Sequence, residues 1–240
     1  DSTNAEARRR AIAGERGPLY VRADSQIAGR GRSGREWSAP RGNLALSRLG
    51  RIDAPLSAIP QLSLVAGVAV YRAAVDALSG GDETRGLQLK WPNDILLGGA
   101  KLAGILVEAT TLAGDLLAVI GIGVNVAHAP KVQNRRTAAL ADNVSGVPDV
   151  KNLARRMAHH LEDALAVWDE SRGFEAIRNA WLSGAIAGGT AMTIWTPAGQ
   201  VSGLFQGLDS GGALILAEEG GGVRRFTHGD VTLASEWEMS

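Results

Sequence analysis

The hydrophobic spacing of the sequence changes at residues 184–189, and this change constrains the fold more than any other feature. Before it, apolar residues recur at helical spacing over residues 59–78 and 150–171, with shorter apolar runs between. After it, only short apolar runs separated by glycine turns remain. Side chains alternate along strands with a period of two, whereas helices need a period of about 3.6 residues. We therefore expect an α+β domain over residues 1–184 and a small β-barrel over residues 185–240.

Short apolar segments predict the strands, and turn residues predict the connections between them. In the first domain the expected strands cover residues 19–23, 43–48, 87–91, 95–97, 101–110 and 116–126. Gly98 and Gly99 separate two of these segments and predict a hairpin. In the second domain the expected strands cover residues 191–195, 201–208, 213–217, 223–226 and 230–233. Thr3 followed by Glu6 fits a capping box, so we expect a helix to begin there.

The composition excludes several classes of function. The 240 residues are 45% hydrophobic, so the chain can bury a sizeable core. Its 25 basic and 25 acidic residues balance, which gives no reason to expect a nucleic acid partner. The absence of cysteine excludes disulfides, thiolate metal sites and a cysteine nucleophile. The longest apolar stretch, residues 62–78, is broken by Ser63, Arg72 and Asp76, and there is no signal peptide. We therefore expect a cytoplasmic protein with a buried core helix and no membrane partner.

Residues 26–37, here called the Gly/Arg segment, read Q-I-A-G-R-G-R-S-G-R-E-W. Glycine allows tight bends and close approach to a ligand, and arginine matches the geometry of phosphate and carboxylate. The G-x-G-x-x-G spacing also occurs in dinucleotide-binding turns, but a helix must follow such a turn directly. Pro40 and Gly42 argue against that helix. The segment alone leaves two explanations open, an anion-binding loop and a solvated basic loop.

Three further segments combine cations, amides and glycines. They are K-W-P-N-D at residues 90–94, K-L-A-G-I-L-V-E at residues 101–108 and G-I-G-V-N at residues 121–125. Alternation puts Lys90 on the opposite face from its apolar neighbours, and Gly104 interrupts a strand where a ligand can approach closely. Each segment alone also fits a simple structural explanation: a turn, a solvated lysine or a bulge.

The absence of certain functional groups limits the reactions that the protein could catalyse. The four histidines show no metal-ligand spacing, and no G-x-S-x-G nucleophile elbow occurs. The candidate site that these segments would form has many cations, the carboxylate of Asp94 and no obvious covalent nucleophile. Such a set suits the joining of a carboxylate to a nucleotide phosphate, because positive charge offsets the repulsion between two anions.

Taken in order, these segments resemble the biotin protein ligases, or biotin–[acetyl-CoA carboxylase] ligases. The resemblance also includes S-T-N at residues 2–4 and G-D-V at residues 229–231. It implies a catalytic domain like that of class II aminoacyl-tRNA synthetases, with a mixed sheet flanked by helices, followed by an SH3-like barrel. Larger members carry an N-terminal winged helix-turn-helix that represses biotin genes. Nothing before Asp1 supplies one, so we expect a form without DNA binding; we also expect that residues are missing upstream of Asp1.

The resemblance implies a ligase that acts in two steps. Biotin and ATP, with Mg²⁺, give biotinyl-5′-AMP and pyrophosphate. The biotinyl group then moves to a lysine of a biotin carboxyl carrier protein, such as the carrier domain of acetyl-CoA carboxylase. No protein side chain is assigned to the metal, and the oligomeric state, including a homodimer, stays open.

Matched positions imply the site residues. Those at biotin are Ser2, Thr3, Gln26, Gly29, Arg30 and Gly104. Those at ATP and the adenylate are Arg32, Arg35, Trp37, Lys90, Asn93, Lys101 and Asn125. The catalytic residues are Lys101, Arg32 and Asp94. Lys101 would be the main cation at the carboxylate–phosphate junction. Asp94 would orient groups there, accept the proton of the incoming lysine or act through Mg²⁺.

Two other functions stay open. A lipoate–protein ligase or octanoyltransferase shares the catalytic fold, but the Gly/Arg segment ending in Trp37 and the K-W-P-N-D segment favour biotin. A non-catalytic biotin-binding regulator would not need the cations Arg32, Arg35, Lys90 and Lys101. Because biotinyl-AMP is a reactive mixed anhydride that must be shielded from water, we expect the Gly/Arg segment to move when empty and to order over the ligand.

Overall fold

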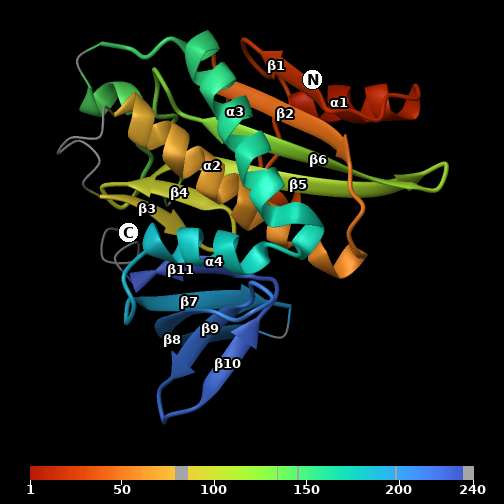
Figure 1. Cartoon of the computed structure of the whole chain (residues 1–240). Helices are drawn as coiled ribbons and strands as arrows, with labels where there is room; N and C mark the ends of the chain where they lie inside the picture. The colour runs from red at the N-terminus through yellow and green to blue at the C-terminus, as the bar shows by residue number, and fades with distance from the viewer. Residues whose placement is uncertain (79–85, 134, 145, 198, 235–240) are drawn as a thin grey trace.

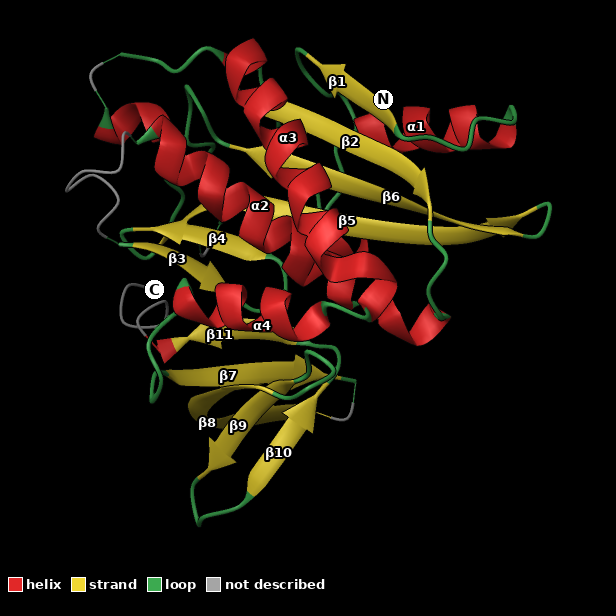
Figure 2. Ribbon diagram, in the orientation of Figure 1, coloured by secondary structure: helices red, strands yellow, loops and turns green. Residues whose placement is uncertain are grey.

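Within the residues that the structure describes, two sheets of six and five strands organise the chain (Figure 1). They are seen in a computed structural model that describes residues 1–78, 86–133, 135–144, 146–197 and 199–234. The helices pack on the larger sheet, and the smaller sheet follows at the C-terminal end of the chain (Figure 2). This arrangement confirms the predicted α+β domain followed by a small β-domain.

The larger sheet has the strand order β1-β2-β6-β5-β4-β3. Its strands are β1 (Leu19–Ala23), β2 (Leu44–Arg51), β3 (Leu87–Lys90), β4 (Asp94–Leu97), β5 (Ala100–Leu112) and β6 (Asp115–Val124). These strands pair antiparallel, and two isolated parallel bridges, Leu89–Ala185 and Lys101–Thr137, make the sheet mixed. Two glycines with positive φ form the turn between β4 and β5, which confirms the predicted hairpin.

The α-helices of the described residues are α1 (Thr3–Ile12), α2 (Gln61–Ala77), α3 (Val150–Trp168) and α4 (Phe174–Ser183). The first three cover both faces of the larger sheet, and α4 packs against α2, α3 and β8. α2 and α3 pack against each other on one face (Figure 1). α1 covers the other face, where Ala7 and Ala11 pack near Leu49 and Val119. The helical span Leu56–Ala77 is long and apolar enough to cross a membrane, but 67% of its apolar window is buried inside the molecule, as in a core helix.

The smaller sheet has the strand order β10-β9-β8-β7-β11. Its strands are β7 (Ala191–Thr196), β8 (Gly199–Leu208), β9 (Leu214–Glu218), β10 (Val223–Phe226) and β11 (Asp230–Leu233). One continuous hydrophobic core joins it to the larger sheet. Across the contact, the Trp91 indole donates to the Gly212 carbonyl at 3.2 Å, and the Arg178 guanidinium donates to the Leu208 carbonyl at 2.8 Å.

A partly buried polar network fastens α3 to the larger sheet. Arg48 on β2 donates to Glu162 on α3 at 2.7 Å, and the Tyr20 hydroxyl on β1 donates to the same carboxylate at 2.8 Å. Burial alone would raise the pKa of Glu162, but the hydrogen bonds from Arg48 and Tyr20 outweigh it and hold that pKa below its ordinary value. Burial and the neighbouring carboxylate raise the pKa of Tyr20. At neutral pH Glu162 is therefore ionised and Tyr20 is neutral.

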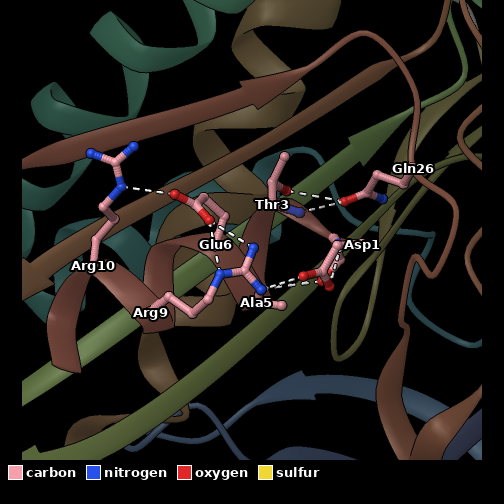
Figure 3. A network of polar contacts seen from close by, with 8 residues as sticks. Asp1, Thr3, Ala5, Glu6, Arg9, Arg10 and Gln26 are labelled. Atoms are coloured by element: carbon pink, nitrogen blue, oxygen red, sulfur yellow. Dashed lines mark hydrogen bonds and ion pairs between the residues drawn. The ribbon is translucent and has the colours of Figure 1, made fainter. Parts of the chain in front are cut away.

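The start of α1 differs from the predicted capping box. Ser2, not Thr3, caps the helix, and its hydroxyl accepts a hydrogen bond from the backbone amide three residues later at 3.1 Å. Glu6 does not reach back to the cap but forms ion pairs with Arg9 and Arg10, each at 2.7 Å (Figure 3). The shift of one residue releases the Thr3 side chain from capping and turns it toward the interior of the protein.

Candidate active site

A cavity of about 440 Å³ is lined by the larger sheet, the Gly/Arg segment and the start of β11. The residues predicted from the sequence that line it are Ser2, Thr3, Gln26, Arg30, Arg32, Arg35, Trp37, Asn93, Asp94, Lys101, Gly104 and Asn125. Gly29 and Lys90 do not line it. A Cβ at Gly29 would lie 2.1 Å from the Trp37 carbonyl oxygen, so Gly29 is needed where the segment packs on itself. Lys90 is buried and pairs with Asp94 across β3 and β4.

One part of the cavity presents neutral hydrogen-bonding groups. The Thr3 amide and hydroxyl both donate to the Gln26 side-chain oxygen, at 2.8 and 3.1 Å (Figure 3). Behind them, the Ser47 hydroxyl donates to the Thr3 hydroxyl at 2.7 Å. Ser47 gives no signal in the sequence, because it belongs to none of the distinctive segments. Together these groups can bind an uncharged polar part of a ligand.

The indole of Trp37 lies against the sheet at a glycine. A Cβ at Gly123 would lie 2.3 Å from the indole, and a Cβ at Gly121 would lie 2.2 Å from the Asn4 side-chain oxygen. β6 pairs with both neighbours without a register shift, so these glycines do not form a bulge. They are required by the side chains that lie over them. The Lys101 ammonium lies 5.5 Å from the centre of the indole, within range of a cation–π interaction.

Another part of the cavity is charged. The Lys101 ammonium lies 2.5 Å from one oxygen of Asp94, and the Arg135 guanidinium lies 3.7 Å from the other. Burial alone would raise the pKa of Asp94, but the charges of Lys101 and Lys90 outweigh it and hold that pKa below its ordinary value. Burial lowers the pKa of Lys101, and Asp94 offsets part of that fall. Arg135 was not predicted, because residues 130–149 show no hydrophobic period.

Two asparagines fix the backbone around this charged pair. The Asn93 amide donates to a carbonyl of β5 at 2.7 Å and accepts from Arg32 at 3.2 Å. The Asn125 amide donates to the carbonyls of Lys101 and Ala138, at 3.3 and 3.1 Å. Both asparagines therefore hold neighbouring groups in place while facing the cavity.

The Gly/Arg segment reaches the smaller sheet through its arginines. Arg32 donates to the Gly229 carbonyl at 3.0 Å, and Arg35 forms an ion pair with Asp230 at the start of β11. Asp230 belongs to the G-D-V segment but was not predicted as a site residue, because no local pattern connects residues that lie 195 positions apart. These contacts make the smaller sheet one wall of the cavity.

Similar solved structures place the fold among the protein ligases. A biotin protein ligase from Aquifex aeolicus, in complex with biotin and ATP, matches with a TM-score of 0.78 and 25% identity, covering 97% of this chain and 94% of that one. A biotin protein ligase from Leishmania major, in complex with biotin, matches with a TM-score of 0.64 and 27% identity, covering 94% of both chains. The mixed sheet with flanking helices and the C-terminal SH3-like domain are the predicted fold.

Sequence comparison gives the family. Residues 1–125 match the biotin/lipoate A/B protein ligase family, and residues 191–233 match the biotin protein ligase C-terminal domain. A biotin–[acetyl-CoA-carboxylase] ligase of Paracoccus denitrificans is 41% identical over 221 residues, with 90% of both chains covered. One of Mycobacterium tuberculosis is 34% identical over 234 residues, covering 96% of this chain and 85% of the relative. The chain belongs to the biotin/lipoate A/B protein ligase family, which confirms the resemblance seen in its motifs.

Proposed function

We propose that the chain is an ATP-dependent biotin–protein ligase. It would form biotinyl-5′-AMP from biotin and ATP and transfer the biotinyl group to a lysine of a biotin carboxyl carrier domain. The observation that carries this proposal is one cavity that combines the neutral groups around Thr3 and Gln26 with the Lys101–Asp94 pair. Biotin carries neutral ring amides at one end and a carboxylate at the other, so it suits such a cavity. The names of the relatives and the ligands of the Aquifex aeolicus structure add support.

In the first step, a carboxylate oxygen of biotin attacks the α-phosphorus of ATP. The bond from that phosphorus to the bridging oxygen breaks, and pyrophosphate leaves with the electron pair. The Lys101 ammonium offsets the repulsion between the two anions, because it is a buried cation beside the cavity. Arg32 and Arg35 add positive charge from the Gly/Arg segment.

In the second step, the neutral ε-amine of the acceptor lysine attacks the acyl carbon. The bond from that carbon to the phosphate oxygen breaks, AMP leaves with the electron pair, and the proton of the amine passes to solvent. Asp94 has a pKa below its ordinary value, so its carboxylate is a weak proton acceptor. We therefore assign Asp94 to the positioning of Lys101 rather than to proton transfer. Lys90 does not line the cavity and would act on the site through Asp94, across β3 and β4.

The remaining assignments follow the position of each residue. To biotin we assign Ser2, Thr3, Gln26, Arg30 and Gly104, with Gly29 shaping the segment behind them. To ATP and the adenylate we assign Arg32, Arg35, Trp37, Asn93, Lys101 and Asn125. We propose residues 1–184 as the catalytic domain and residues 185–240 as the SH3-like domain, although both contribute to the cavity.

Mg²⁺ would enter with the phosphates of ATP. Among the described residues there is no group of three or more His, Cys, Asp or Glu side chains that could hold a metal ion. The oxygens of Asp94 face Lys101 and Arg135, and Asp230 pairs with Arg35. When bound, the ion would neutralise phosphate charge, and the protein would supply cations around it.

The protein substrate, the cellular location and the oligomeric state are also proposed. The names of the relatives point to the carrier domain of acetyl-CoA carboxylase as the protein substrate. We propose a cytoplasmic setting for the ligase, in keeping with a sequence that has no cysteine. A homodimer is a second possibility beside a monomer, and sedimentation velocity with and without biotin and MgATP distinguishes them.

One assay tests the function. The protein is incubated with MgATP, a biotin carboxyl carrier domain and either biotin or lipoate, and the carrier is then weighed by mass spectrometry. A mass gain of one biotinyl group with biotin alone is expected. A gain with lipoate instead would identify a lipoate ligase of the same family. Biotin binding without any gain in carrier mass would indicate a non-catalytic regulator and would refute the proposal.

A further inference from the structure

Arg135 lines the cavity and is a cation. It lies outside the four segments at residues 26–37, 90–94, 101–108 and 121–125. Its side chain is 29% exposed, and its nearest charged neighbour is Asp94, at 3.7 Å. Within the described part of the chain its guanidinium donates no hydrogen bond, and 3.7 Å is too long for one. The group has five N–H donors. Arg135 lines the cavity, so these donors are available to a ligand there.

The backbone fixes Arg135 beside Lys101. The Lys101 amide donates to the Arg136 carbonyl at 2.9 Å, and the Ala138 amide donates to the Lys101 carbonyl at 3.0 Å. The amide of Asn125 also holds the Ala138 carbonyl. The residues that follow Arg135 thus form an isolated parallel bridge, Lys101–Thr137, at the start of β5. This pairing holds the backbone of Arg135 near that of Lys101.

Among the described residues, two cations that line the cavity, Lys101 and Arg135, share the single carboxylate of Asp94. Cations held in a low-dielectric site are costly unless anions match them. Lys101 takes the nearer oxygen of Asp94 at 2.5 Å, so Arg135 is left with the weaker contact. An anionic ligand at this point would complete the balance.

The two cations beside Asp94 differ in how far their side chains are exposed to solvent. The side chain of Lys101 is 13% exposed, whereas that of Arg135 is 29% exposed. Lys101 is therefore placed deeper, where the acyl–phosphate bond forms, and Arg135 lies nearer to solvent, where a leaving group must depart. Arg32 and Arg35 differ from Arg135, because both already bond to the start of β11.

We propose that Arg135 is a catalytic residue of the adenylation step that binds the departing pyrophosphate. This inference rests on the proposed ligase function. As the bond between the α-phosphorus and the bridging oxygen breaks, negative charge gathers on the leaving group, and the guanidinium donates hydrogen bonds to its oxygens. The second step releases AMP and involves no pyrophosphate, so Arg135 does not contribute to it.

The test separates the two steps in the intact protein. The variants are Arg135→Gln, Arg135→Lys and, as a matched control, Arg136→Gln, whose side chain does not line the cavity. Biotin-dependent ATP–pyrophosphate exchange reports the first step. Single-turnover transfer from supplied biotinyl-5′-AMP to a carrier domain reports the second step. Circular dichroism and thermal melting confirm that each variant is folded.

Arg135→Gln should slow exchange about ten- to a hundredfold, the usual effect of losing hydrogen bonds to a charged group, and should raise the KM for pyrophosphate. Arg135→Lys should restore part of the rate, and Arg136→Gln should match the wild type. Transfer from biotinyl-5′-AMP should stay within about twofold in all variants.

An exchange rate of Arg135→Gln within twofold of the wild-type rate would overturn the inference. So would an equal loss in both steps, because Arg135 would then serve only to hold Asp94. Absence of exchange in the wild type would instead refute the ligase function.

Discussion

The contact between Trp37 and Gly123 leaves no room for a methyl group, and this gives a test at the scale of one residue. Gly123→Ala would put a Cβ 2.3 Å from the indole, so Trp37 must move away from Lys101. We expect at least a tenfold loss of adenylation and a loss of about 1–3 kcal/mol in the free energy of unfolding. ATP–pyrophosphate exchange and chemical denaturation measure the two effects. Gly188→Ala is the control, because a Cβ there meets no atom within 4 Å.

Lys101 gives a second prediction at this scale. Lys101→Ala removes the cation from the reacting end of the cavity but leaves the hydrogen bonds of Thr3 and Gln26 in place. We expect adenylation to fall by about a hundredfold or more, while the Kd for biotin, measured by calorimetry, changes by less than about fivefold. Lys131→Ala, which does not line the cavity, is the control. A parallel loss of biotin binding and adenylation would contradict the role assigned to Lys101.

Single residues were predictable from the sequence only when they belonged to a segment with a distinctive pattern. Lys101, Asp94 and Asn125 lie in such segments, and the cavity brings them together. Arg135 and Ser47 could not be found in this way, because their places in the site come from pairing between distant parts of the chain. Local capping rules place the start of α1 correctly only to within one residue, because neighbouring hydroxyls compete for the cap.

At the scale of elements, the network between α3 and the larger sheet predicts a pH dependence. The pKa of Glu162 is lowered in the folded protein, relative to about 4.3 in an unfolded chain. Ionised Glu162 therefore stabilises the fold above that pH, and the stabilisation is lost as the pH falls through the folded pKa, which lies below the unfolded value. Glu162→Gln should cost about 1 kcal/mol at pH 7, because it leaves buried Arg48 without a carboxylate.

Chemical denaturation from pH 7 down to about pH 3 checks this prediction. The difference in unfolding free energy between the wild type and Glu162→Gln should be constant near neutral pH and shrink at the acidic end. Asp163→Asn changes the adjacent residue, which is exposed, and should show no comparable effect. A difference that stays constant down to pH 3 would show that the network does not titrate in this way.

The Gly/Arg segment gives a second prediction for an element. Arg32 and Arg35 bond to Gly229 and Asp230, so under the roles proposed for them they would change partners on binding an adenylate. We expect amide hydrogen exchange of residues 26–37 to slow when biotin and MgATP are added, since the segment then orders over the ligand. Exchange in α3 serves as the internal control and should not change. Equal exchange with and without ligands would mean that the segment is already ordered.

Strands and helices were largely predictable because each follows one hydrophobic period. The predicted strand over residues 19–23 and the predicted hairpin at Gly98 and Gly99 agree with the structure. The order β1-β2-β6-β5-β4-β3 could not be predicted from periods alone, since it places β6 between strands that come earlier in the chain. The parallel pairing of Lys101 with Thr137 could not be predicted from the sequence either, because residues 130–149 carry no strand pattern.

At the scale of the whole molecule, the continuous core predicts how the protein unfolds. Because one hydrophobic cluster extends through both sheets, we expect a single cooperative transition in calorimetry. Arg178→Gln removes the hydrogen bonds to the Leu208 carbonyl and should lower the Tm by a few degrees without splitting the transition. Arg172→Gln, which loses only an exposed ion pair, is the control. Two resolved transitions in the wild type would show that the sheets unfold independently.

The cavity takes its walls from both extremes of the sequence, since Thr3 and Asp230 both line it. During synthesis the N-terminal residues leave the ribosome first, and the larger sheet can begin to fold before β11 exists. The residues that bond to Arg32 and Arg35 are made 197 and 195 positions after these arginines. A nascent chain, or a product of premature termination, therefore lacks a wall of the cavity. Reactive biotinyl-5′-AMP would be formed and retained only by chains whose translation has passed β11.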